Sequence, residues 1–223
     1  MNKLFIIGLP RTGTTSISVA LLKYDFKVAH TAFTKYAFEL ADVISDAPCF
    51  SDYKELDALF PGSKFVYLER DLEQWIPSAQ MLLQKMESRL HPHTGVFSPV
   101  LKRSFNKVFN LYNSPDLYSE SHLKNCYLKH QDEVLNYFSE RDDLISINVS
   151  HKNSLPRLIE FLGLPMNDQA SFPHLNQGRH VAGWKEFKHP NKVNANSAGL
   201  ERRKFFDYHS EQLKKQPHST NSF

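Results

Sequence analysis

Residues 6–16 read IIGLPRTGTTS, an apolar run that passes through a turn bounded by two glycines into a threonine-rich segment. The run from Lys3 to Gly8 is typical of a buried parallel strand, and apolar residues at helical spacing predict a helix from Thr14 to Tyr24. Gly8 and Gly13 allow the backbone between these elements to turn tightly. The amides at the helix start, three threonine hydroxyls and the charge of Arg11 therefore predict a site for a phosphate-like anion.

The turn almost matches the ATP-binding P-loop, whose rule is G-x-x-x-x-G-K-[ST]. Gly8, Gly13 and Thr15 agree with that rule, but Thr14 stands where it requires the lysine that reaches the β- and γ-phosphates. An ATP-dependent small-molecule kinase is therefore disfavoured, and it stays an alternative. A non-catalytic nucleotide-binding module is the alternative from another functional class.

Strands and helices alternate along the rest of the chain. Further strands are expected over Phe26 to Ala29, Lys64 to Leu68 and Leu144 to Val149, and helices over residues 35–43, 51–60, 72–86, 117–138, 155–162 and 200–213. Pro77 predicts either a kink in its helix or a late start of the regular part. The alternation predicts an α/β fold of three layers, a central parallel sheet flanked by helices. We expect one domain over residues 1–223, with a mainly helical insertion or lid at about 91–140 and a polar extension at about 185–223.

Composition excludes several classes of protein. The net charge of +3, without blocks of like charge, gives no reason to expect a nucleic-acid surface. The short apolar run at the N-terminus is broken by Pro10, so we expect no signal peptide, no membrane span and a cytoplasmic protein. Cys49 and Cys126 are expected to be reduced thiols. His91 and His93 lack a third ligand at suitable spacing, so we expect no metal site.

The segment GLPRTGTTS resembles the 5′-phosphosulfate loop of the PAPS-dependent sulfotransferases, where PAPS is 3′-phosphoadenosine 5′-phosphosulfate. That family's pattern is proline, a basic residue, a small residue and Gly-Thr-Thr, matched here in order by Pro10, Arg11, Thr12, Gly13, Thr14 and Thr15. Ser16 completes the loop where many members have a tryptophan that stacks on adenine. The resemblance implies a P-loop fold with PAPS as donor, and transfer of a sulfonate group to an acceptor hydroxyl or amine. In that reaction Arg11 would also stabilise the developing charge.

A second motif resembles the segment with which the same family binds the 3′-phosphate of PAPS. It consists of an arginine at a strand end and a serine eight residues later, matched by Arg70 and Ser78 in YLERDLEQWIPS. Arg179, in FPHLNQGRH, occupies the place of a third phosphate ligand, with an ordinary exposed arginine as the alternative. Trp184 or Phe172 would have to replace the missing stacking tryptophan, although each is more often a packing residue.

The resemblance also directs attention to the general base. The cytosolic branch of the family uses a histidine two residues before a proline, and the comparable stretch here, SDAP, has Asp46 at that place. A carboxylate can act as a base when burial brings its pKa towards neutrality. Asp46 is the first candidate, His30 the second, and Glu39 remains open. The acceptor is expected to be a small molecule or glycan, and its identity and the oligomeric state stay open.

Overall fold

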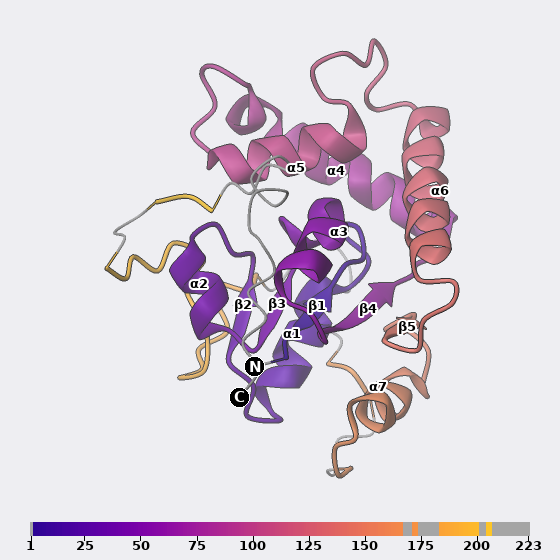
Figure 1. Cartoon of the computed structure of the whole chain (residues 1–223). Helices are drawn as coiled ribbons and strands as arrows, with labels where there is room; N and C mark the ends of the chain where they lie inside the picture. Colours follow the sequence, from indigo (N-terminus) through magenta and orange to yellow (C-terminus); the bar gives the residue numbers. More distant parts are fainter. Residues whose placement is uncertain (1, 167–170, 174–182, 201–203, 207–223) are drawn as a thin grey trace.

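The computed structural model describes residues 2–166, 171–173, 183–200 and 204–206, and within them the chain forms five strands and seven helices (Figure 1). The strands are β1 (Leu4–Ile6), β2 (Val28–His30), β3 (Val43–Ser45), β4 (Lys64–Leu68) and β5 (Leu144–Ile147). The helices are α1 (Thr14–Leu22), α2 (Lys35–Leu40), α3 (Cys49–Leu59), α4 (Leu72–Leu90), α5 (Pro99–Phe109), α6 (Glu120–Tyr137) and α7 (Ser154–Leu162). All five strands are parallel, which confirms the predicted α/β fold.

β1 lies in the middle of the sheet, whose order is β2-β3-β1-β4-β5. Phe5 of β1 pairs with Ile44 of β3 on one side and with Phe65 of β4 on the other. The chain leaves β1 for the β2 edge and later leaves β4 for the opposite edge. The carboxyl ends of β1 and β4 therefore flank the point where the strand order reverses, and ligands bind at such points in open α/β sheets.

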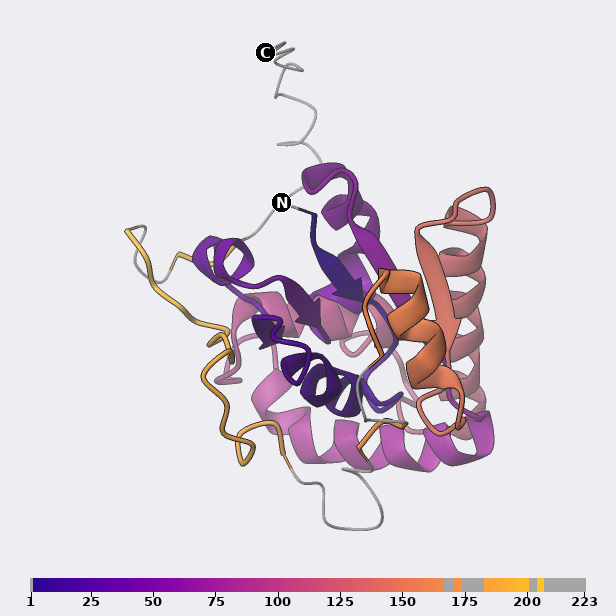
Figure 2. The ribbon, with the colours of Figure 1, turned by 90° about the horizontal axis from the view of Figure 1, so that it is seen from below.

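Helices cover both faces of the sheet. On one face α1 and α7 pack against the strands (Figure 2), and Ile17 and Leu158 are fully buried there. On the opposite face lie α3 and α6, with Leu56 fully buried. Phe5 belongs to this second cluster and its neighbour Ile6 to the first, because successive strand residues point to opposite faces.

A third apolar cluster joins α4, α5 and α6 beyond the carboxyl ends of the strands. Leu9 follows β1 and Ala47 follows β3, and both are fully buried in this cluster. α4 begins at Leu72 and continues through Pro77, so the amphipathic helix predicted there is present and starts before the proline. The region 91–140 contains α5 and α6 and is mainly helical, as predicted. None of the described helices is both long and apolar enough to span a membrane.

The segment 183–200 runs along β2, which is an edge strand of the sheet. The Val28 N–H donates to the Asn191 carbonyl and the Val193 N–H donates to the Val28 carbonyl, both at 2.9 Å. Farther along, the Phe33 N–H donates to the Ala195 carbonyl at 2.9 Å. These bonds satisfy backbone groups that an edge strand leaves unpaired. They also place this segment beside the carboxyl end of β2.

Two predicted elements differ from the structure. The helix predicted to reach Val43 ends at Leu40 as α2, and Val43 opens β3, a strand that we did not predict. β3 has only three residues and all are buried, so the sequence shows neither the length nor the alternation that identifies a strand. The helix predicted over 200–213 is absent at Leu200 and 204–206. Its remaining residues lie outside the described ones.

Candidate active site

The loop between β1 and α1 has the tight form that an anion site requires. A Cβ atom on Gly8 would lie 2.5 Å from the Leu68 Cβ, so glycine allows the ends of β1 and β4 to meet. Gly13 caps α1 with a φ of 110°. Thr12 is buried, and its hydroxyl donates to the Leu9 carbonyl at 2.7 Å, so this hydroxyl shapes the loop rather than facing a phosphate as predicted. The unpaired amides of the first turn of α1 remain for a ligand.

The two predicted phosphate motifs meet beside this loop. Arg11 Nε donates to Ser78 Oγ at 2.8 Å, and Arg70 Nη1 donates to the Arg11 carbonyl at 2.7 Å. Arg70 follows β4, and Ser78 lies on α4, almost two turns into the helix. The groups that the sequence assigns to two phosphates of one ligand therefore lie in contact with one another.

The Arg11 and Arg70 side chains are partly buried and carry like charges. Burial lowers the pKa of Arg11 and the positive charge of Arg70 lowers it further, while Asp46 opposes both effects. Burial also lowers the pKa of Arg70, and Asp71 opposes that shift. In the described part of the chain neither arginine forms an ion pair. Because the two positive charges repel each other, an anion bound near both side chains would be favoured, since it would offset their repulsion.

His30 and Asp46, the first two candidates for the general base, lie beside the start of α1. His30 ends β2 and Asp46 follows β3, and His30 Nδ1 lies 3.9 Å from Asp46 Oδ2. Thr15 Oγ1 is 2.9 Å from His30 Nε2, and Thr14 Oγ1 donates to Asp46 Oδ2 at 3.3 Å. The anion loop and both candidate bases thus form one continuous group of side chains.

The protonation of His30 is set mainly by burial. Burial lowers the pKa of His30 below its ordinary value of 6.5, and the positive charge of Lys192 lowers it slightly more. The negative charge of Asp46 opposes this shift, with a smaller effect than burial. The imidazole is therefore neutral near pH 7 and able to accept a proton.

Three residues at the carboxyl edge hold a left-handed backbone. They are Arg11 with φ 74°, Thr31 with φ 87° and Asp46 with φ 60°, and they follow β1, β2 and β3 respectively. For residues other than glycine such a conformation costs about 1–3 kcal/mol, and such residues cluster at functional sites. A β-branched residue such as Thr31 is the least expected there. The strain therefore coincides with the ends of the strands that carry the candidate site.

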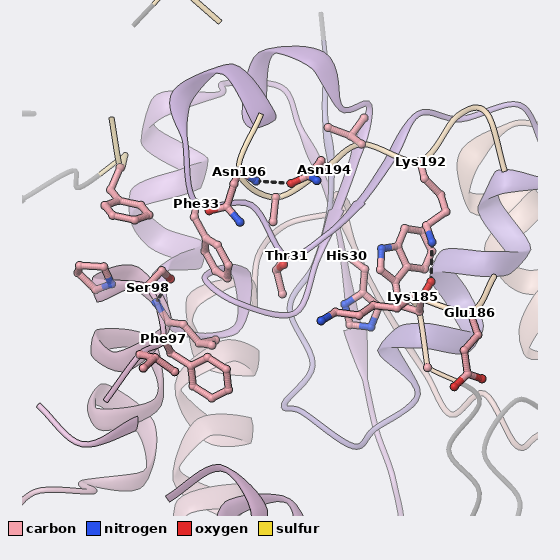
Figure 3. A pocket seen from close by; sticks show the side chains of 18 of the residues that line it. His30, Thr31, Phe33, Phe97, Ser98, Lys185, Glu186, Lys192, Asn194 and Asn196 are labelled. Carbon is pink, nitrogen blue, oxygen red and sulfur yellow. Dashed lines mark hydrogen bonds between the residues drawn. The ribbon is translucent and has the colours of Figure 1, made fainter. Parts of the chain in front are cut away.

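A cavity of about 1410 Å³ opens beside His30 (Figure 3). Its walls come from the end of β2, the segment that leads into α5, and residues 183–186 and 192–196, together with Lys85 of α4 and Phe205. Trp184 forms part of the wall, with its ring centroid 5.5 Å from that of His30. Its lining includes neither Arg11 nor Arg70. His30 therefore connects this cavity to the anion loop, through Thr15.

The sulfotransferase domain family matches residues 31–181, which is more than half of the chain. The chain belongs to this family. The match begins after the loop at 10–16 and includes Asp46, Arg70 and Ser78, so the loop and the family match support the same assignment independently. A search of curated proteins found no significant match. Membership of this family favours a sulfotransferase over the two alternatives, the kinase and the non-catalytic nucleotide-binding module.

Two residues that the sequence did not single out position the arginines of this sulfotransferase. The Tyr127 hydroxyl, on α6, accepts from the Arg70 N–H and donates to the Arg70 carbonyl, both at 2.9 Å. Trp75 Nε1 donates to the Pro10 carbonyl at 2.9 Å. The sequence identifies Trp75 only as an apolar position of a helix. It gives no signal for Tyr127, which lies 57 positions beyond Arg70.

Of four other residues that the sequence singles out, the structure describes Glu39, Phe172 and Ser16. Glu39 is exposed, lies 3.9 Å from Lys35, and its carbonyl accepts from Lys3 at the amino end of β1, away from the loop. Phe172 is only 3% exposed and packs with α1 and α7, so it has no free face for adenine. Ser16 is buried in the first turn of α1. Arg179 lies outside the described residues.

Gly13→Ala should destabilise the sulfotransferase by about 1–3 kcal/mol from backbone strain alone, and by more because of a clash. A Cβ atom at Gly13 would lie 2.4 Å from Val149 Cγ2. Chemical denaturation measures the free energy of unfolding. Gly163→Ala is the matched control, since Gly163 also has a positive φ, of 69°, and nothing within 4 Å of an added Cβ. Equal losses in the two variants would contradict a role for the contact with Val149.

Proposed function

We propose that this sulfotransferase moves a sulfonate group from PAPS to a hydroxyl or amine of an acceptor molecule. The observation that carries the proposal is the contact of the Arg70 side chain with the Arg11 carbonyl at the switch point of the sheet, where neither arginine forms an ion pair among the described residues. Each of the two motifs that resemble those of PAPS-dependent enzymes supplies one of these arginines. An anion with two phosphate groups would offset their repulsion.

The side chains at this point fit such a donor. Arg11 uses only Nε for Ser78, and Arg70 uses only Nη1 for the Arg11 carbonyl, in the contacts that the structure gives. Their remaining guanidinium N–H groups and the first amides of α1 are donors that match phosphate oxygens. We assign the loop from Pro10 to Ser16 to the phosphosulfate, and Arg70 with Ser78 to the 3′-phosphate.

Bound PAPS would supply the sulfonate together with a leaving group, 3′,5′-diphosphoadenosine. The acceptor oxygen or nitrogen forms a bond to sulfur while the bond from sulfur to the bridging phosphate oxygen breaks, and the electron pair leaves with the phosphate. Arg11 and the amides of α1 stabilise the charge that grows on that phosphate. The acceptor proton goes to His30, which lines the cavity and has Thr15 at Nε2 and Asp46 near Nδ1. Asp46 as the base itself remains the alternative.

Calorimetry with 3′,5′-diphosphoadenosine tests the donor assignment. We expect this nucleotide to bind without magnesium and more tightly than Mg-ATP, because the loop lacks the P-loop lysine. A preference for Mg-ATP would refute the assignment. Transfer of label from radiolabelled PAPS to any acceptor then tests the reaction.

Arg70→Ala should weaken binding of 3′,5′-diphosphoadenosine about ten- to a hundredfold, since a hydrogen bond to a charged group contributes about 1.5–3 kcal/mol. Binding of 5′-adenosine monophosphate, which lacks the 3′-phosphate, should change little. Arg157→Ala is the control for the loss of one positive charge, because Arg157 is exposed on α7. If both nucleotides lose the same affinity in Arg70→Ala, Arg70 does not recognise the 3′-phosphate.

A further inference from the structure

The lining of the cavity beside His30 combines aromatic and polar side chains. Phe33, Phe97 and Trp184 contribute aromatic surface to its lining. Thr31, Ser98 and Asn194 contribute polar groups from three different segments of the chain (Figure 3). At about 1410 Å³ the space exceeds the range of about 300–1,000 Å³ that is typical of small-molecule pockets. An acceptor with a flat apolar part and polar substituents fits these walls.

Two polar side chains of this lining already accept hydrogen bonds from the protein backbone. The Asn194 side-chain oxygen already accepts from the Asn196 N–H at 2.8 Å, and Ser98 Oγ accepts from the Leu101 N–H at 3.1 Å. The Asn194 amide N–H₂ and the Ser98 O–H are therefore left as donors. A ligand that brings acceptor oxygens would satisfy them.

The charged side chains of the lining also favour a ligand with acceptor oxygens. Its described residues include Lys85, Lys185 and Lys192 against a single carboxylate, that of Glu186. Lys192 Nζ donates to the Trp184 and Phe187 carbonyls, each at 2.5 Å, so it stabilises the backbone of this part of the cavity lining. Neither Lys85 nor Lys185 has an ion-pair partner in the part of the chain that the structure describes. The Lys185 side chain extends towards His30 and Thr31, whereas the Glu186 carboxylate points away from them (Figure 3).

We infer that the acceptor of this enzyme is an anion: a hydroxyl-bearing carboxylate with a flat apolar face. Lys185, together with Lys85, binds the carboxylate, and the aromatic side chains cover the apolar face. The hydroxyl then lies at His30, beside the anion loop. Only the transfer step of this inference rests on the proposed function. The preference of the cavity for an anion concerns binding and can be measured without transfer.

Matched acceptors test the inference by direct binding. 4-Hydroxyphenylacetate, its amide and tyramine share one phenol and carry a negative, a neutral and a positive group. Titrated into enzyme saturated with 3′,5′-diphosphoadenosine, the acid should bind about tenfold more tightly than the amide or the amine, as expected for a charge-assisted hydrogen bond. Glucuronate against glucose forms the second arm and distinguishes a sugar acid from a phenolic acid. Tighter binding of the amide or the amine, or equal binding of all three, overturns the inference.

Lysine variants locate the effect. Lys185→Gln should remove most of the preference for the acid while leaving the affinity for the amide unchanged, and Lys85→Gln should have a smaller effect. Lys188→Gln is the control, because Lys188 is exposed on the same segment and does not line the cavity. A preference for the acid that survives in the Lys85→Gln/Lys185→Gln double variant overturns the inference. If the acid binds but takes no label from PAPS, the proposed function is wrong and the anion site is supported. If the amide and the acid are sulfated equally well, the proposed function is supported and the preference for an anionic acceptor is wrong.

Discussion

Arg11→Ala should lower the rate of sulfonate transfer by about 10²–10³-fold, which corresponds to about 2.7–4 kcal/mol of barrier. Arg11 is held in place before a ligand arrives, by its own Nε bond to Ser78 and by the bond from Arg70 to its carbonyl. It can therefore meet charge that develops on the leaving phosphate without reorganising. Because this charge is larger in the transition state than in bound PAPS, the loss should appear in kcat more than in donor affinity.

Arg11→Lys separates charge from geometry. The lysine keeps the positive charge but loses the planar fork that can donate to Ser78 and a phosphate together, so we expect an intermediate rate. At position 11 the backbone has a φ of 74°, and this left-handed conformation is equally unfavourable for arginine, lysine and alanine. The melting temperatures of the three proteins should therefore differ little. The measurement is steady-state kinetics with radiolabelled PAPS. A rise in the KM for PAPS with kcat unchanged in Arg11→Ala would show that Arg11 only binds the donor.

The elements around the anion loop could be predicted because each is marked locally. Gly8 and Gly13 bound the loop, and their roles are steric: a Cβ would meet Leu68 at one and Val149 at the other. β4 and α4 were recognised from an apolar run and from helical spacing. β3 cannot be predicted in this way because three buried residues show no periodicity, and the sequence instead predicts a helix over Val43.

The contacts within the site depend on sheet order, which the sequence does not state. Arg11 and Ser78 were assigned to separate phosphates, and they meet because β4 pairs directly with β1. His30 and Asp46 were alternatives for one role, and they lie together because β2 pairs with β3. Each residue could be found from its own segment, but the pairing of strands decided which of them touch.

His30→Gln should lower kcat by about 10²–10⁴-fold if the imidazole takes the acceptor proton. In the unaltered enzyme the rate should rise with pH through a pKa below 6.5 and stay level around neutrality, because burial lowers the pKa of His30. That acidic limb should vanish in His30→Gln. Glutamine keeps a polar side chain of similar size, so binding of 3′,5′-diphosphoadenosine serves as the check that the site is intact.

Asp46→Asn decides between the two candidate bases. The Asp46 charge raises the pKa of His30 against the larger effect of burial, so removing it should lower that pKa and move the acidic limb of the rate profile to lower pH. If His30 is the base, the activity of Asp46→Asn around neutral pH should exceed that of His30→Gln, because the neutral imidazole is still present. Retained activity in His30→Gln together with its loss in Asp46→Asn would instead make Asp46 the base. Since Thr14 donates to Asp46 and Thr15 contacts His30, either result connects the base to the helix that begins at the anion loop.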